Sequence, residues 1–166
     1  FDTSGYMVTG WYLNQDGWYY FNGSGAMVTG WQLIGGTWYY LDGTNVDYPG
    51  LMVSSCKKEI GDQTYFFQGS GAMYTGWALM PEGWYYTNGS GAMVTGWQLV
   101  GGVWYYLDGT NVDYPGLMVS SCKKEIGDQI YFFQGSGAMY TGWALMPEGW
   151  YYTNGSGAMV TGWQLI

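Results

Sequence analysis

The chain has 166 residues and a net charge of −8, and 21% of its residues are aromatic, 30 are glycines and only 10% are charged. With four lysines, no arginine and no histidine it offers few cations to a phosphate backbone, which argues against nucleic acid as a partner. No stretch approaches the roughly 20 apolar residues of a membrane-spanning helix, and no signal peptide opens the chain, so we expect no membrane insertion. Recurrent glycines disfavour helix, whereas Trp, Tyr, Thr and Val favour strands, so the fold class is predicted to be all-β.

Repeats with a period of 20 residues organise the chain, and each is marked by two tryptophans. The first follows a glycine, and the second comes seven residues later. First tryptophans are Trp11, Trp31, Trp77, Trp97, Trp143 and Trp163, and second tryptophans are Trp18, Trp38, Trp84, Trp104 and Trp150. The chain begins and ends inside a repeat, so we expect a single array, residues 1–166, cut from a longer one.

Each repeat is predicted to form two short strands joined by tight turns. The segment 18–20 reads Trp-Tyr-Tyr, which is β-prone, while Asn-Gly-Ser-Gly at 22–25 and Ile-Gly-Gly at 34–36 supply the positive φ angles of turns. Strand alternation puts Trp18 and Tyr20 on one face and Tyr19 on the other. An isolated hairpin of this size is marginal in water, so we expect neighbouring hairpins to stack into a solenoid.

A longer period of 66 residues lies over the short one, because residues 31–100 recur almost unchanged as 97–166. It comprises two 20-residue repeats and one long repeat of 26, around residues 38–64 and 104–130. In the long repeats we expect Cys56 and Cys122 near the first tryptophan position, with Thr64 and Ile130 at the second. Both cysteines are predicted to be unpaired within the chain.

The pattern Gly-Trp, Trp-Tyr-Tyr and Gly-x-Met resembles the choline-binding repeats of Gram-positive surface proteins and covers nearly the whole chain. The resemblance implies a superhelix with about three hairpins per turn. It also implies that choline, or a choline-bearing teichoic acid, binds between consecutive hairpins, and that the chain is secreted or displayed on the bacterial cell surface. Such a site is an aromatic cage, since ring faces hold a trimethylammonium group that has no hydrogen-bond donors.

The resemblance implies four cages, each with two tryptophans, one aromatic ring of the next repeat and a methionine. The first is Trp11, Trp18 and Tyr40 with Met27; the second is Trp31, Trp38 and Phe66 with Met52; the third is Trp77, Trp84 and Tyr106 with Met93; the fourth is Trp97, Trp104 and Phe132 with Met118. The remaining pair, Trp143 and Trp150, lacks a third wall. Phe is a weaker cation–π partner, so the second and fourth cages are expected to bind less tightly.

The long repeats are predicted to lack a cage, because neither indole is present and the pairs Lys57–Lys58 and Lys123–Lys124 repel an ammonium group. By contrast, five tyrosines at the middle strand position are assigned to the core: Tyr19, Tyr39, Tyr85, Tyr105 and Tyr151.

Two other functions stay open at this stage. Related repeats bind glucans or host glycans, and Gln32 and Gln98 beside the aromatic residues suit sugar stacking. The array could also be a structural or engineered spacer. Catalysis is not expected, because there is no histidine and the acidic residues sit singly in turns. One cysteine per 66 residues makes a metal site improbable, and no cofactor is predicted.

Overall fold

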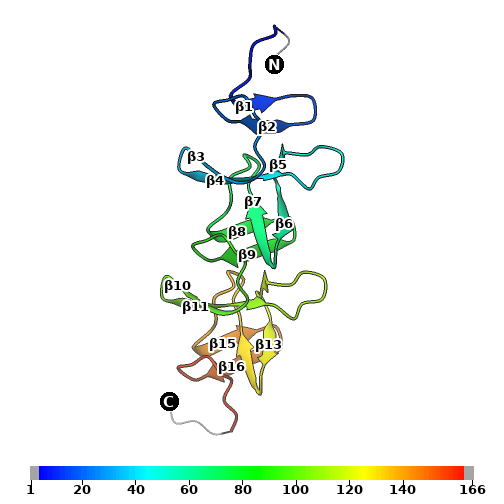
Figure 1. The fold of residues 1–166 in the computed structure, drawn as a ribbon. Coiled ribbons are helices and arrows are strands. Elements are labelled where there is room, and N and C mark those ends of the chain that lie inside the picture. Colours follow the sequence, from blue (N-terminus) through cyan, green and yellow to red (C-terminus); the bar gives the residue numbers. More distant parts are fainter. Residues whose placement is uncertain (1–3, 163–166) are drawn as a thin grey trace. The chain divides into compact units, whose positions relative to one another are not determined.

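The computed structural model describes residues 4–162, which form short antiparallel strands and turns with no helix in that range. Two compact units are distinguished, residues 1–78 with 87–93 and residues 79–86 with 94–166, and each is described by itself. In each unit, hairpins follow one another along the chain (Figure 1). The predicted all-β fold of stacked short hairpins is therefore confirmed, while the number of hairpins per turn stays a prediction.

The first unit contains three sheets, which are formed by β1 with β2, by β3, β4 and β5, and by β6 with β7. The bounds of these strands are β1 Gly10–Leu13, β2 Trp18–Phe21, β3 Gly30–Ile34, β4 Thr37–Asp42, β5 Leu51–Met52, β6 Cys56–Ile60 and β7 Gln63–Phe67. The second unit contains one three-stranded sheet, β10–β11–β12, followed by the hairpins β13–β14 and β15–β16. The bounds of these strands are β10 Gly96–Val100, β11 Val103–Asp108, β12 Leu117–Met118, β13 Lys123–Ile126, β14 Gln129–Phe132, β15 Gly142–Met146 and β16 Gly149–Thr153. Strands β8 Gly76–Met80 and β9 Gly83–Thr87 form the hairpin in which the chain passes from one unit to the other.

Strand register decides which side chains share a face. In the β3–β4 hairpin Trp31 lies opposite Tyr40 and Leu33 opposite Trp38, whereas Gln32 lies opposite Tyr39. Directly opposed residues of an antiparallel pair point to the same side, and successive residues alternate. One face therefore carries both indoles and Tyr40, and the other carries Tyr39.

The turns that end the hairpins are organised by one side chain. Asn88 Oδ1 accepts hydrogen bonds from the backbone N–H groups of Ser90 and Ala92, both at 3.0 Å, and from the Ser90 hydroxyl at 2.7 Å. In the long repeats Asp42 and Asp108 take this position, and each accepts hydrogen bonds from Thr44 or Thr110 before the longer loop begins. The Asn-Gly-Ser segments are thus turns, as predicted from their composition.

The glycine of each Gly-Ala-Met segment is required for two reasons. Gly71 has φ +81°, which L side chains rarely adopt, and a Cβ at this position would collide with the sulfur of Met52 in the preceding repeat. Gly137 stands in the same relation to Met118. This close approach locks the methionine of one repeat under the turn of the next.

Candidate functional site

The pockets between consecutive hairpins gather the paired tryptophans. Three of these pockets are each lined by residues of one unit only, two in the first unit and one in the second. We name each pocket after its first tryptophan. The Trp11 pocket is lined by Trp11, Trp18, Tyr39, Met52 and Ser70; the Trp31 pocket by Trp31, Trp38, Tyr65, Met73, Gly89 and Ser90; the Trp97 pocket by Trp97, Trp104, Tyr131, Met139 and Ser156. Their volumes are about 290, 320 and 290 Å³, respectively.

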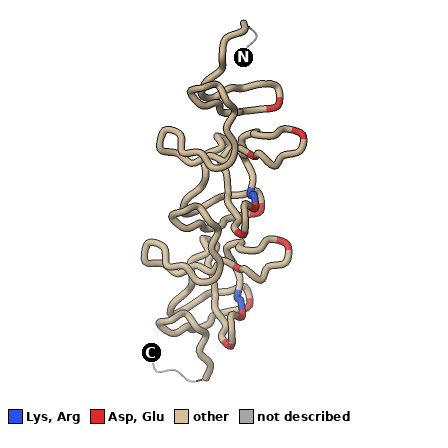
Figure 2. The backbone as a smooth tube through the Cα atoms, in the orientation of Figure 1, with Lys and Arg blue, Asp and Glu red and all other residues tan. Residues whose placement is uncertain are grey.

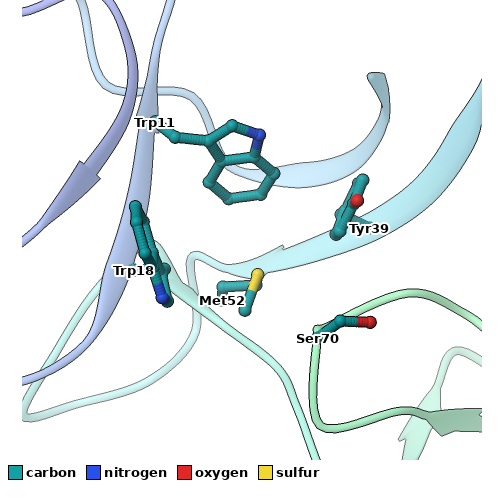
Figure 3. Close-up of a pocket in the computed structure, with 5 residues that line it drawn as sticks. All are labelled: Trp11, Trp18, Tyr39, Met52 and Ser70. Atoms are coloured by element: carbon teal, nitrogen blue, oxygen red, sulfur yellow. The ribbon is translucent and has the colours of Figure 1, made fainter. Parts of the chain in front are cut away.

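The three rings of each pocket stand at steep angles to one another. In the Trp11 pocket the indoles of Trp11 and Trp18 are 6.2 Å apart at 88°, and Tyr39 lies 4.9 Å from Trp11 at 71°. Figure 3 shows these rings around an open centre, with the Met52 thioether and Ser70 at its edge. The second indole of each pair stays open to solvent, since Trp18, Trp38 and Trp104 are 41 to 43% exposed.

The same geometry recurs in the other two pockets. Trp31 and Trp38 are 6.3 Å apart at 88°, and Trp97 and Trp104 are 6.3 Å apart at 90°. The tyrosine of the next hairpin lies 4.7 Å from Trp31 or 4.8 Å from Trp97. The near-identical spacings mean that the three pockets offer the same cavity to a ligand.

The third wall differs from the sequence prediction, which chose Tyr40 for the first cage and Phe66 and Phe132 for the second and fourth. The structure places Tyr39, Tyr65 and Tyr131 there instead. The predicted ring is on the wrong face of its strand: Tyr40 packs beside Trp31 of its own hairpin at 5.1 Å, and Phe66 and Phe132 are fully buried. All three pockets therefore have a tyrosine wall, which removes the basis for weaker second and fourth sites.

The methionine prediction needs the same kind of correction. Met27, Met52 and Met118 were assigned to the first, second and fourth cages, but the thioethers found there belong to Met52, Met73 and Met139. Met27 instead packs over Gly50, where a Cβ would lie 2.8 Å from its sulfur. Each of these methionines lines the pocket of the hairpin before the one that it follows: Met73 comes after β7 but lies in the β3–β4 pocket. There its N–H donates to the Trp38 carbonyl, and the Met139 N–H donates in the same way to the Trp104 carbonyl, both at 2.9 Å.

The predicted core tyrosines separate into two groups. Tyr19 and Tyr85 are buried, as expected, whereas Tyr39, Tyr105 and Tyr151 are half-buried. Tyr39 is a pocket wall rather than core. The serines of the following turn, Ser70, Ser90 and Ser156, were also missed, because no single repeat indicates which later turn approaches the pocket.

Two predicted sites remain outside this description. The third cage takes Trp77 and Met93 from the first unit and Trp84 and Tyr106 from the second, so it stays a prediction. Trp143 and Trp150 keep the paired geometry, at 6.3 Å and 88°, but are 54 and 64% exposed because no described hairpin follows them. Trp163 lies outside the described residues.

The charged residues of each unit lie on the side of the long loops, and the turns of the β3–β4 and β10–β11 hairpins carry none (Figure 2). Lys58 Nζ is 2.7 Å from Asp42 Oδ2, an almost buried carboxylate, and Lys124 pairs with Asp108 at 2.6 Å. Burial alone raises the pKa of both aspartates, but hydrogen bonds from the lysine and the threonine outweigh it and hold each pKa below its usual value. These pairs tie each long loop to the next hairpin.

The described part of the chain provides little for other chemistry. Cys56 and Cys122 are both free, and burial raises the pKa of each thiol, which lowers its reactivity. No cluster of three metal-ligating side chains occurs among residues 4–162. No helix in that range has the length and apolar character needed to cross a bilayer.

Comparison with known proteins agrees with this geometry. A family model described as "Choline-binding repeat" matches residues 1–28, 15–46, 53–95 and 119–166, and one described as "Putative cell wall binding repeat" matches 95–110. The chain belongs to the choline-binding repeat family. No curated protein sequence matches it.

Among the solved structures of similar fold are proteins from pneumococcus and from one of its phages. CbpJ from Streptococcus pneumoniae TIGR4 is 35% identical with a TM-score of 0.78, over 92% of this chain and 52% of that one. Choline binding protein F from Streptococcus pneumoniae, in the presence of a peptidoglycan analogue, is 34% identical with a TM-score of 0.77, over 95 and 54%. The pneumococcal cell wall endolysin from phage Cp-1, complexed with choline, is 33% identical with a TM-score of 0.55, over 84 and 39%. The chain thus spans about half the length of the first two.

Proposed function

We propose that this chain is a non-catalytic module of the bacterial cell surface that binds choline and choline-bearing cell-wall polymers, with one trimethylammonium group in each pocket. The observation that carries the proposal is the three-ring pocket itself. In the Trp97 pocket two perpendicular indoles and a tyrosine surround a cavity whose lining has no carboxylate. Electron-rich ring faces attract a cation that has no hydrogen-bond donors, and apolar walls suit its methyl groups.

Choline fits these pockets better than a sugar does. A pyranose stacks on one flat ring, whereas here the two indoles meet at nearly 90° and enclose a rounded group. The amides that suited sugar binding at the sequence level are engaged by the chain itself. Gln32 Nε2 donates to the Thr29 carbonyl at 3.1 Å, and Gln98 Nε2 donates to the Thr95 carbonyl at 3.4 Å.

The expected affinity of one pocket is modest. Each ring contributes about 0.5 to 2 kcal/mol to cation binding, so three rings give a few kcal/mol, close to the roughly 4 kcal/mol of a millimolar complex. A polymer that bears many choline groups engages several pockets at once, which raises the overall affinity by a factor of roughly 10² to 10⁴. A repeat array is therefore suited to hold a decorated polymer rather than free choline.

Titration followed by Trp fluorescence tests the proposal. Choline and tetramethylammonium are expected to change the emission at millimolar concentration and to raise the melting temperature, because they bind only the folded array. Ethanolamine should bind less well, since a primary ammonium keeps its hydrogen bonds to water. Equal affinity for ethanolamine and choline, or saturation by a glucan oligosaccharide in place of choline, contradicts the proposal.

A pair of variants in one hairpin locates the site. Trp38→Ala removes a wall of the Trp31 pocket and should lower the number of bound cholines by one. Leu33→Ala is the matched control, because Leu33 lies opposite Trp38 in register and is 57% exposed but does not line the pocket. Loss of all binding in a folded Trp38→Ala chain would show that the pockets are not independent.

A further inference from the structure

The β13–β14 hairpin of the second long repeat has the backbone of a cage without its indoles. In β10–β11 Trp97 lies opposite Tyr106, and in β13–β14 Lys123 lies opposite Phe132. The second indole position, held by Trp104 opposite Leu99, is held by Ile130 opposite Glu125. Lys123, and not Cys122 as the sequence suggested, therefore occupies the place of the first indole.

The ring of the next hairpin is still present at this position. Tyr151 follows Trp150 as Tyr131 follows Ile130, so it is the residue that would close a cage on β13–β14. The Lys123 ammonium nitrogen lies 5.7 Å from the centroid of the Tyr151 ring, within the range of a cation–π contact. The chain thus places a cation of its own on Tyr151, whose counterpart in the Trp97 pocket, Tyr131, faces the open cavity.

Phe132 and Ile130 also pack into this site. Phe132 stacks on Tyr151 at 4.7 Å with an interplanar angle of 29°, and Ile130 packs against the same buried cluster. The Lys123 ammonium also forms an ion pair with Glu148, with 3.0 Å between Nζ and Oε1. The hydrogen bond to Glu148 also raises the pKa of Lys123, so its ammonium stays charged at neutral pH.

We propose that Lys123 is a built-in cation that takes the place of the ligand in the second long repeat and makes it a permanently occupied joint between hairpins. The ammonium of Lys123 makes on Tyr151 the contact that a quaternary ammonium ligand makes on Tyr131. Its like charge and the closed packing around Ile130 exclude that ligand. Lys123 is therefore a specificity-determining residue that limits binding to the hairpins with paired tryptophans, and this part rests on the function proposed above.

The chain suits a direct test by NMR, because it has only four lysines and no arginine. Selective labelling of lysine gives four sets of side-chain signals, and Lys123→Met identifies the one from Lys123. The Lys123 ε-CH₂ signal is expected to be shifted upfield by the Tyr151 ring, and Tyr151→Leu should remove that shift. Lys124, paired with Asp108, is the control whose signal should not respond to Tyr151→Leu.

Choline is then added until the Trp emission saturates. The proposal predicts that the Lys123 signal does not move. An unshifted Lys123 signal in the unmodified chain, or a signal that choline drives to its position in Tyr151→Leu, overturns the proposal. If choline changes neither the Trp emission nor any lysine signal, the function proposed above fails, while the upfield shift still reports the internal cation.

A gain of binding tests the exclusion independently. Lys123→Trp combined with Ile130→Trp restores both indole walls and removes the internal cation, so calorimetry should find one additional choline per chain. Lys123→Gln alone is the control and should add none. An unchanged number of sites in a folded double variant contradicts the assignment of Lys123 and Ile130 as the residues that close the site, and the NMR measurement decides if the double variant does not fold.

Discussion

The hairpins β10–β11 and β13–β14 of the second unit share one pairing pattern but differ in what lies between them and the next hairpin. The first leaves a cavity of about 290 Å³ with three ring walls, and the second is filled by Ile130, Phe132 and the Lys123 ammonium. Both hairpins also accept the same backbone hydrogen bond from a later methionine. The Met139 N–H donates to the Trp104 carbonyl, and the Met159 N–H donates to the Ile130 carbonyl. Two side-chain positions, and not the backbone, therefore decide whether a joint is open to a ligand.

Substitution at the first indole position should separate the two kinds of joint most strongly. Trp97 contacts Trp104, Tyr106, Tyr131 and Phe133, so Trp97→Ala is expected to lower the free energy of unfolding by about 3 to 5 kcal/mol and to abolish one choline site. Lys123→Ala at the matched position removes an exposed ion pair and should change stability little. Urea denaturation of both variants checks this, and equal losses would contradict the distinction.

Substitution of the glycine that contacts a pocket methionine is expected to cause the next largest loss of stability. Gly71→Ala combines backbone strain with a collision against Met52, so a loss of about 2 to 5 kcal/mol is expected, together with weaker choline binding in the Trp11 pocket. Gly30→Ala is the matched control, because Gly30 has φ +77° and no atom within 4 Å of the added Cβ. It should lose only about 1 to 2 kcal/mol. Similar losses in both would show that Met52 yields without strain.

Most of the fold could be predicted from the sequence, and the site only in part. Paired tryptophans and turn residues indicate the hairpins, and alternation places Tyr39 and Tyr40 on opposite faces. Which of these faces meets the preceding hairpin depends on the rotation between successive hairpins, which no local pattern encodes. The methionines were assigned to the wrong pockets for the same reason. The chemistry of Met52 suits the pocket of an earlier hairpin and that of a later one equally well.

The long repeats should also respond to acid differently from the tryptophan pockets. Asp42 and Asp108 have a folded-state pKa below that of the unfolded chain, so their pairs with Lys58 and Lys124 stabilise the fold above pH about 4. This contribution is lost as the pH falls through the folded-state pKa. The free energy of unfolding should therefore be lower at pH 3 than at pH 6. The double variant Asp42→Asn, Asp108→Asn should show a smaller decrease, and an equal decrease in the unmodified chain and the variant would contradict this explanation. Choline affinity should stay constant where the chain is folded, because the Trp31 pocket lining holds no carboxylate.

The smallest expected difference concerns the turns. Asn88 accepts three hydrogen bonds. Gln68 takes the place of Asn88 at the start of the turn after β7, where the Ala72 N–H donates to the Ser70 hydroxyl at 3.4 Å. Asn88→Ala is expected to destabilise by about 1 kcal/mol, and Gln68→Ala by less. Thermal unfolding of the two variants provides the measurement, and a larger loss for Gln68→Ala would rule out the side-chain explanation of the Asn-Gly-Ser turn.

A crystal structure of this chain grown in choline tests the central claim most directly. The account predicts one trimethylammonium group among Trp97, Trp104 and Tyr131, with corresponding groups in the Trp11 and Trp31 pockets, and the Lys123 ammonium still resting on Tyr151. Choline bound beside Tyr106, choline in place of the Lys123 ammonium, or no choline at the paired tryptophans would contradict it.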